Sequence, residues 1–150
     1  MHFSANHHWK LEADSIISDD SSTPVYAFKS AGGEIIPVRI VCPDVLPAID
    51  SGKLIEGQVV AFADSIVKVS ENSLPDYSVS KTDDECCVIK GVITDVNLGK
   101  FIFNDIESSF WELDVECENG EISVLIAEDG IDFIPEQGNA ISAHAMISMD

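Results

Sequence analysis

The feature of this sequence that most constrains its fold is an approximate internal repeat. Residues 25–40 read as an alternating apolar and polar segment, a polar turn with Gly-Glu-Ile and a second alternating segment, and residues 111–126 repeat this order. Alternation with a period of two is typical of half-buried β-strands. The dipeptides Gly32-Gly33 and Asn119-Gly120 accept the positive φ of tight hairpin turns. The sequence therefore predicts two β-hairpins related by duplication.

The resemblance between the two halves extends beyond the hairpins. Each hairpin is followed by an apolar residue before a proline, and then by a glycine that opens a β-type segment, at residues 57–63 and 138–145. Each is preceded by a further apolar segment, at residues 9–17 and 87–96. The second of these contains Gly91, which is typical of a strand that bends or bulges. Helical patterns are weak, so we expect about ten short, mostly antiparallel strands.

One half, read as a bent strand, a hairpin, a loop and a closing strand, resembles an OB-fold, the five-stranded Greek-key barrel. The residues that carry the resemblance are Gly91-Val92-Ile93, residues 110–115, Ile122-Ser123-Val124 and residues 135–141. The resemblance implies an all-β fold of two tandem OB-like small barrels with little helix. A single larger sandwich built from the duplicated unit is the alternative.

A polar stretch that contains a proline lies between the two halves and predicts a linker or long loop at residues 71–86. Residues 1–70 and residues 87–150 are then expected to form the two OB-like halves. Because halves of about 70 residues bury only marginal cores, we expect them to pack against each other.

The net charge disfavours several classes of ligand. The chain carries 27 acidic and 8 basic residues, a net charge of −19, and Arg39 is its only arginine. Since phosphate groups are bound chiefly by Lys and Arg, the sequence disfavours nucleic acid and predicts no membrane binding. Residues 81–150 carry 16 acidic and 3 basic residues, against 11 and 5 in residues 1–80. The charge serves either solubility or the attraction of a basic protein.

Five residues around the second hairpin are our candidates for a partner-binding surface. Trp111 alternates with Leu113 and Val115, which predicts that these three side chains face the core. Phe110 and the acidic residues then face the other way, where an aromatic beside carboxylates suits an interface anchor. The alternatives are that Phe110 packs beneath a loop and that the acids form a solvated face. The candidates are Phe110, Glu112, Asp114, Glu116 and Glu118.

No catalytic or cofactor-binding motif is recognised. The Gly-x-Ser-x-Gly, phosphate-loop and dinucleotide fingerprints are absent from the sequence. Cys86 and Cys87 are adjacent, while Cys42 and Cys117 stand alone, so the Cys-x₂-Cys spacing of a zinc site does not occur. A Cys–His pair would have to use His144, the only histidine inside a predicted strand. We predict no catalytic residues, no metal site and no cofactor.

Together these observations predict an acidic protein-binding module that masks or inhibits a basic partner. The type we favour is an immunity or antitoxin protein against a nuclease-type toxin, because an acidic inhibitor can occupy a site built for phosphate. The alternatives are an OB-fold protein that binds single-stranded nucleic acid and a structural or assembly subunit that pairs through an edge strand.

The sequence also suggests a compartment. No targeting segment and no apolar run long enough to span a bilayer are visible. Four cysteines without a disulfide-type spacing are typical of free thiols in a reducing environment. We therefore expect a cytoplasmic protein.

Overall fold

The computed structural model describes residues 7–18, 24–41, 52–69, 77–83 and 85–150. Its strands are β1 (His8–Ser18), β2 (Val25–Lys29), β3 (Ile35–Ile40), β4 (Leu54–Lys68), β5 (Ser78–Lys81), β6 (Cys87–Phe103), β7 (Ile106–Cys117), β8 (Gly120–Ala127) and β9 (Ala140–Met149).

The described residues contain no α-helix, and their one helical element is a 3₁₀ turn, η2 (Glu128–Gly130). The predicted all-β fold with little helix is confirmed. Among the described residues, no helix is long and hydrophobic enough to cross a membrane.

Both predicted hairpins are present. The turn between β2 and β3 places Gly33 at φ 87°, and the turn between β7 and β8 places Gly120 at φ 107°. Glycine adopts this left-handed region without steric cost. A third hairpin joins β6 to β7 through Asn104 (φ 51°) and Asp105 (φ 63°), two residue types that tolerate the positive φ of a type I′ turn. Residues 101–103 are the end of β6.

Gly91 and the bulge in β6 are separate features. A Cβ atom at position 91 would lie 2.0 Å from the backbone oxygen of Glu116, so glycine is required there by the close approach of β7. The register shift lies two residues later, between Ile93 and Asp95. The predicted irregularity in this strand is therefore present, but glycine and bulge do not coincide.

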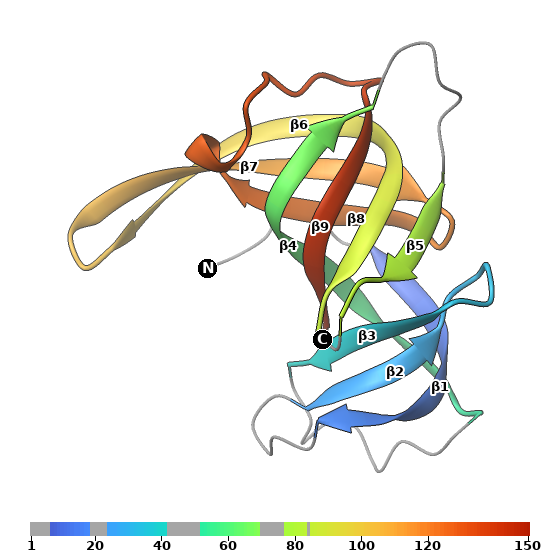
Figure 1. Cartoon of the computed structure of the whole chain (residues 1–150). Coiled ribbons are helices and arrows are strands. Elements are labelled where there is room, and N and C mark those ends of the chain that lie inside the picture. The colour runs from blue at the N-terminus through green and yellow to red at the C-terminus, as the bar shows by residue number, and fades with distance from the viewer. Residues whose placement is uncertain (1–6, 19–23, 42–51, 70–76, 84) are drawn as a thin grey trace.

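The strands form one sheet that closes on itself twice (Figure 1). The strand order is β1-β2-β3-β9-β4-β8-β7-β6-β5, with additional pairings of β1 with β4 and of β9 with β6. The first additional pairing completes a ring of β1, β2, β3, β9 and β4, which we call the first ring. The second completes a ring of β4, β8, β7, β6 and β9, which we call the second ring. Strands β4 and β9 belong to both.

The two rings repeat the same order of strand directions. In the first ring β1, β2 and β3 are antiparallel and β3 then pairs with β9 in parallel. In the second ring β6, β7 and β8 are antiparallel and β8 then pairs with β4 in parallel. The first strand of each ring carries a register shift, between Ala13 and Ser15 in β1 and between Ile93 and Asp95 in β6.

Two features of the predicted organisation stay predictions. The repeated pairings do not by themselves establish a duplication. Two tandem OB-like barrels packed together are not established either, because the two rings share β4 and β9. Of the predicted linker at residues 71–86, residues 71–76 and 84 lie outside the described residues. Residues 78–81 form β5, which pairs with β6.

Strand β9 contributes side chains to the interior of both rings. Its alternate residues Ile141, Ala143, Ala145, Ile147 and Met149 are all buried, and they join one core cluster that includes residues from both rings. Because successive side chains of a strand point to opposite faces, one strand can place every second residue inside.

A tryptophan links the two rings. Trp9 of β1 is 1% exposed, and its indole N–H donates a hydrogen bond to the backbone oxygen of Glu121 in β8 at 3.0 Å. A buried indole usually needs such a partner, because an unpaired polar group inside a protein is costly. Trp9 therefore combines a large apolar contact with a specific polar one across the junction of the rings.

We expect Trp9→Phe to lower the free energy of unfolding by about 2–4 kcal/mol, because it removes buried volume and leaves the Glu121 oxygen without its donor. Urea unfolding followed by circular dichroism measures this. The matched control is Trp111→Phe, at a half-buried site, for which a loss of about 1 kcal/mol is expected. Equal losses for the two variants would contradict the linking role of Trp9.

Candidate functional site

The second ring extends into a two-stranded arm formed by residues 100–109. From Phe110 onward β7 pairs with both β6 and β8, whereas residues 106–109 lie beyond the pairing with β8. The end of the β6–β7 hairpin therefore projects away from the ring (Figure 1). On this arm Ile102 is 72% exposed and Ile106 is 66% exposed. Exposed apolar side chains on a projecting element suit contact with another protein.

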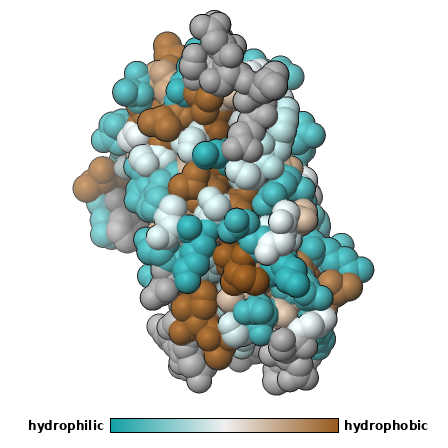
Figure 2. Space-filling view, turned by 45° about the vertical axis from the view of Figure 1, so that its right-hand side comes forward, coloured by the Kyte–Doolittle hydropathy of each residue, from teal (hydrophilic) through white to brown (hydrophobic). Residues whose placement is uncertain are grey.

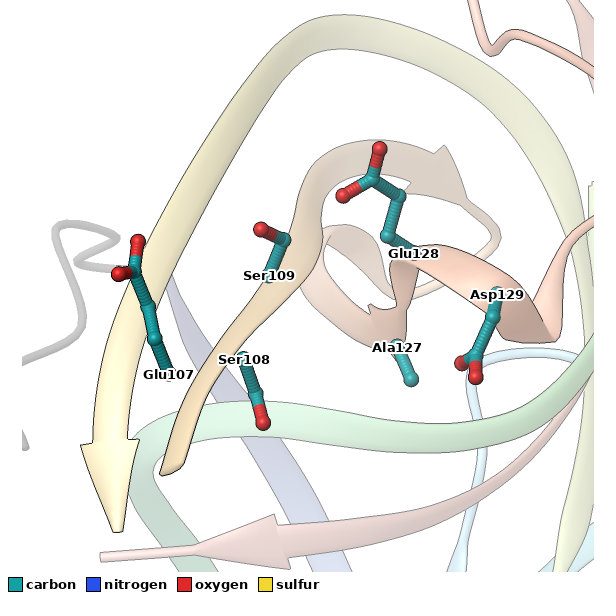
Figure 3. Close-up of a pocket in the computed structure, with 6 residues that line it drawn as sticks. All are labelled: Glu107, Ser108, Ser109, Ala127, Glu128 and Asp129. Atoms are coloured by element: carbon teal, nitrogen blue, oxygen red, sulfur yellow. The ribbon is translucent and has the colours of Figure 1, made fainter. Parts of the chain in front are cut away.

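An open cleft of about 620 Å³ lies at the base of the arm. Glu107, Ser108 and Ser109 line it from β7, and Ala127, Glu128 and Asp129 line it from the end of β8 and from η2. In Figure 3 the carboxylate of Glu107 lies on one side, Glu128 and Asp129 lie on the other, and the two serines lie between them. The cleft is open and is lined mainly by acidic and serine side chains, so it does not suit a buried apolar ligand.

A second cleft of about 280 Å³ shares Asp129 and adds Asp132 to its lining. We call Glu128, Asp129 and Asp132 the acidic patch; all three are exposed. Among the described residues no cation forms an ion pair with them, whereas Glu107 is paired with Lys100 at 3.4 Å. Uncompensated carboxylates attract cations and repel anions. The base of the arm is therefore suited to accept Lys or Arg side chains.

Apolar residues are dispersed over one face of the molecule. On the face shown in Figure 2, hydrophobic residues lie in several separate groups with hydrophilic residues between them. A contact made with this face would therefore bury mixed rather than continuous apolar surface.

The five residues predicted to bind a partner lie along β7 and the turn that follows it. Leu113 and Val115 are buried and Trp111 packs against the core, as expected from their shared face. Phe110 is half-buried at the base of the arm, and its ring covers Gly99, where an added Cβ would lie 2.6 Å from the ring. The glycine thus makes room for the aromatic side chain of the facing strand.

The four acidic candidates differ in their surroundings. Glu112 is only 9% exposed. Asp114 accepts a hydrogen bond from the Ser123 hydroxyl at 2.9 Å and lies 3.2 Å from a ring nitrogen of His7. Glu118 accepts the backbone N–H of Val79 at 3.0 Å. Asp114 and Glu118 therefore hold neighbouring segments, while Glu116 is exposed. Partner binding by these residues stays a prediction.

The arm and the acidic patch were not predicted from the sequence. The signal for the arm was Asn104-Asp105 between two β-type segments, which is a short-range hairpin pattern. The acidic patch follows directly on β8, in residues 128–132. No feature of these residues in the sequence indicates that they lie beside the base of the β6–β7 hairpin.

A second group of functional side chains lies where β4, β9 and the turn between β5 and β6 meet. Ligating atoms of Asp83, Cys86 and His144 all lie within 4.8 Å of one another. Nδ1 of His144 is 2.7 Å from a carboxylate oxygen of Asp64, and its Nε2 is 3.3 Å from the Thr82 hydroxyl. We call Asp83, Cys86 and His144, together with Asp64, the thiol–imidazole cluster.

Local backbone geometry positions two members of this cluster. The Asp83 carboxylate accepts the backbone N–H groups of Glu85 and Cys86, both at 2.9 Å, which fixes the turn before β6. Asp64 lies at a bulge in β4, where the register with β9 shifts between Ala63 and Ser65. A bulge leaves one residue unpaired and can redirect its side chain.

The protonation of the cluster argues against a nucleophilic thiol. The hydrogen bond from the Glu85 backbone lowers the pKa of Asp83, whose carboxyl is therefore charged. Partial burial, and then the negative charges of Asp83 and Asp64, raise the pKa of Cys86 above the ordinary value of 9.0. A thiolate is the reactive form of cysteine, so Cys86 is not activated.

The other described cysteines are less accessible. Burial raises the pKa of Cys87 to about 12 and that of Cys117 to about 11. All three described cysteines are free thiols, and Cys42 lies outside the described residues.

No protein-family model matches the chain, and no curated protein matches it. What the protein does is therefore inferred from the geometry of the arm, the acidic patch and the thiol–imidazole cluster.

In metal-free protein we expect Cys86 to react with iodoacetamide more slowly at pH 7.5 than a small reference thiol, with an apparent pKa above 9.0. Mass spectrometry of the modified peptide over a pH series gives this value. Asp83→Asn removes the nearest negative charge, so the pKa of Cys86 falls and alkylation becomes faster. A wild-type pKa at or below 9.0 would contradict this electrostatic description.

Proposed function

We propose that this protein is an acidic binding module whose arm and acidic patch together engage a basic protein. The observation that carries the proposal is a juxtaposition: a projecting ribbon with exposed Ile102 and Ile106 stands beside carboxylates that have no cationic partner among the described residues. Each feature alone is common on protein surfaces. Their combination has the apolar centre and charged margin of a protein interface.

Electrostatics favours a basic partner for this surface. A net charge of −19 creates a field that speeds the encounter with a positively charged molecule and slows the encounter with polyanions. Guanidinium groups of a partner can bind carboxylates in a bidentate manner. The partner type that fits this chemistry is a nuclease-type toxin, whose site for phosphate is basic. The protein then masks that site as an immunity or antitoxin protein.

The barrel architecture supports the same surface by analogy. Each ring has five strands and the same order of directions, which fits a tandem pair of OB-like barrels that share two strands. OB-folds bind ligands through the face of their second and third strands and through the loop between the first and second. In the second ring these elements are β7, β8 and the arm. Because fold does not determine function, this analogy supports the location only.

Nucleic-acid binding is the weaker alternative. Two lysines, Lys10 and Lys29, line one cleft of about 440 Å³, but Glu12 and Glu118 line it as well. Lys29 is paired with Glu12 at 3.3 Å. A groove for a phosphate backbone requires an excess of cations, and this cleft does not provide one.

The role of the acidic patch is tested by neutralising it. We expect Glu128→Gln/Asp129→Asn/Asp132→Asn to weaken binding of the native partner by at least about tenfold, because each uncompensated carboxylate at an interface contributes on the order of 1 kcal/mol. The partner is captured with wild-type protein from cells of the source organism, purified, and titrated against both proteins by calorimetry at two salt concentrations.

The matched control neutralises three exposed acids of the first ring and its turns, Asp14→Asn/Glu34→Gln/Glu56→Gln, and so changes the net charge equally. Binding close to that of wild type is expected for this control. Equal weakening by both triple variants would contradict a role of the acidic patch, because partner affinity would then depend on net charge alone. Capture of an acidic partner, or of nucleic acid alone, would overturn the proposal.

The role of the arm is tested by Ile102→Thr/Ile106→Thr, which removes exposed apolar surface but keeps β-branched side chains. The free energy of unfolding is expected to change by less than about 0.5 kcal/mol for each exposed site, while partner affinity falls by at least about tenfold. The control Ile16→Thr/Leu54→Thr changes two exposed apolar residues in strands of the first ring. Unchanged affinity in the arm variant would exclude the arm from the interface.

A further inference from the structure

We infer that Asp83, Cys86 and His144 form a binding site for a divalent transition metal, for which Zn²⁺ is the best match. The sequence predicted no metal site, because these residues do not have a zinc-type spacing along the chain. The fold brings them together: Asp83 and Cys86 lie three residues apart in the turn before β6, and His144 lies in β9. This inference does not depend on the proposed partner binding.

The ligand types select the class of metal. A thiolate, an imidazole and a carboxylate are the three side-chain ligands that Zn²⁺ uses most, whereas Mg²⁺ and Ca²⁺ prefer oxygen alone. Bond lengths of about 2.0–2.3 Å place the ligand atoms of a tetrahedral zinc site about 3.3–3.8 Å apart. The three atoms lie within 4.8 Å of one another. Closing around an ion therefore requires a shift of roughly 1 Å. The exposed Asp83 carboxylate can offer its Oδ2 to the ion, because the backbone N–H groups of Glu85 and Cys86 both donate to Oδ1.

Asp64 prepares His144 for this role. With Nδ1 only 2.7 Å from the Asp64 carboxylate, the ring donates its Nδ1–H there. Nε2 is then the nitrogen left for an ion, which would replace the Thr82 hydroxyl that lies 3.3 Å from it. Histidine ligands of metals commonly make such a bond, which fixes the tautomer and ring orientation. The bulge in β4 at Asp64 lies opposite His144, at the Ser65–His144 pair, so the backbone irregularity and the oriented histidine coincide.

Access and charge also fit an ion. Cys86 and His144 are half-buried and Asp83 is exposed, so an ion can enter from solvent and keep water as its fourth ligand. Two carboxylates lie close to this point, Asp83 as a ligand and Asp64 on Nδ1 of His144, and a divalent cation offsets their charge. A bound ion ties the turn before β6 to β9, one of the two strands that the rings share. Metal binding is therefore expected to raise the melting temperature.

The experiment titrates full-length protein, freed of metal by chelation and kept reduced with a phosphine, with Co²⁺ as a spectroscopic probe for Zn²⁺. Wild-type protein is expected to bind one Co²⁺ and to show the charge-transfer band of a thiolate–cobalt bond, which Zn²⁺ then displaces. Cys86→Ser abolishes the band, and His144→Ala weakens binding at least about 100-fold. Asp64→Asn, which alters only the partner of the histidine, weakens it about tenfold.

Three controls separate this site from others. Cys87→Ala removes the adjacent buried thiol and keeps the band. His2→Asn/His7→Asn/His8→Asn removes the N-terminal histidines and keeps the band. The triple acidic-patch variant also retains wild-type metal affinity, which separates this inference from the proposed function. Circular dichroism establishes that each variant is folded.

Absence of saturable binding to folded wild-type protein would overturn the inference. Binding that survives both Cys86→Ser and His144→Ala, or that disappears with the N-terminal histidines, would also overturn it. A rise in melting temperature on addition of Zn²⁺ is expected for wild type and not for Cys86→Ser. An equal rise in both would contradict a site at Cys86.

Discussion

The structure depends on the backbone hydrogen bonds between β4 and β9. These strands pair in antiparallel fashion from Val59 with Met149 to Lys68 with Ile141. One edge of this ribbon receives β1 and then β8, and the other receives β3 and β6. Neither ring can close without both strands: β9 joins β3 to β4 in the first ring, and β4 joins β8 to β9 in the second. One ring would bury little core alone, and sharing the ribbon places both rings around one continuous core.

The same ribbon positions two members of the thiol–imidazole cluster. His144 projects from β9, and Asp64 projects from the bulge that β4 makes where it passes His144. The arm and the acidic patch sit at the far edge of the second ring, where β7 leaves β8. The thiol–imidazole cluster thus lies beside the ribbon, whereas the arm carries the exposed apolar residues and the turn at its base carries the acidic patch. This division fits a stable scaffold that presents one element to a partner.

Local features of this fold could be predicted from the sequence, because they depend on the conformations of neighbouring residues. The turns at Gly33 and Gly120 follow from glycine at positive φ, and the inward face of Leu113 and Val115 follows from alternation. The participation of β4 and β9 in both rings could not be predicted. The backbone hydrogen bonds that pair strands far apart in the sequence do not require a particular pattern of side chains. The proximity of His144 to Cys86 could not be predicted for the same reason. The excess of acidic residues could be counted in the sequence. The sequence did not show which acids make structural contacts, as Asp114 does with Ser123, and which form the acidic patch beside the arm.

The central claim is that the two rings form one cooperative unit through the shared ribbon, and native-state hydrogen exchange tests it most directly. We expect the amides of residues 59–68 and 141–149 that bond within the ribbon to be the most protected. These amides are expected to exchange only by global unfolding, and their free energy of opening is expected to fall with denaturant at the same slope in both rings. The contrary result is exchange of β1–β3 amides through an opening that leaves the amides of β6–β8 and of the ribbon fully protected. That outcome would mean that the second ring is stable without the first.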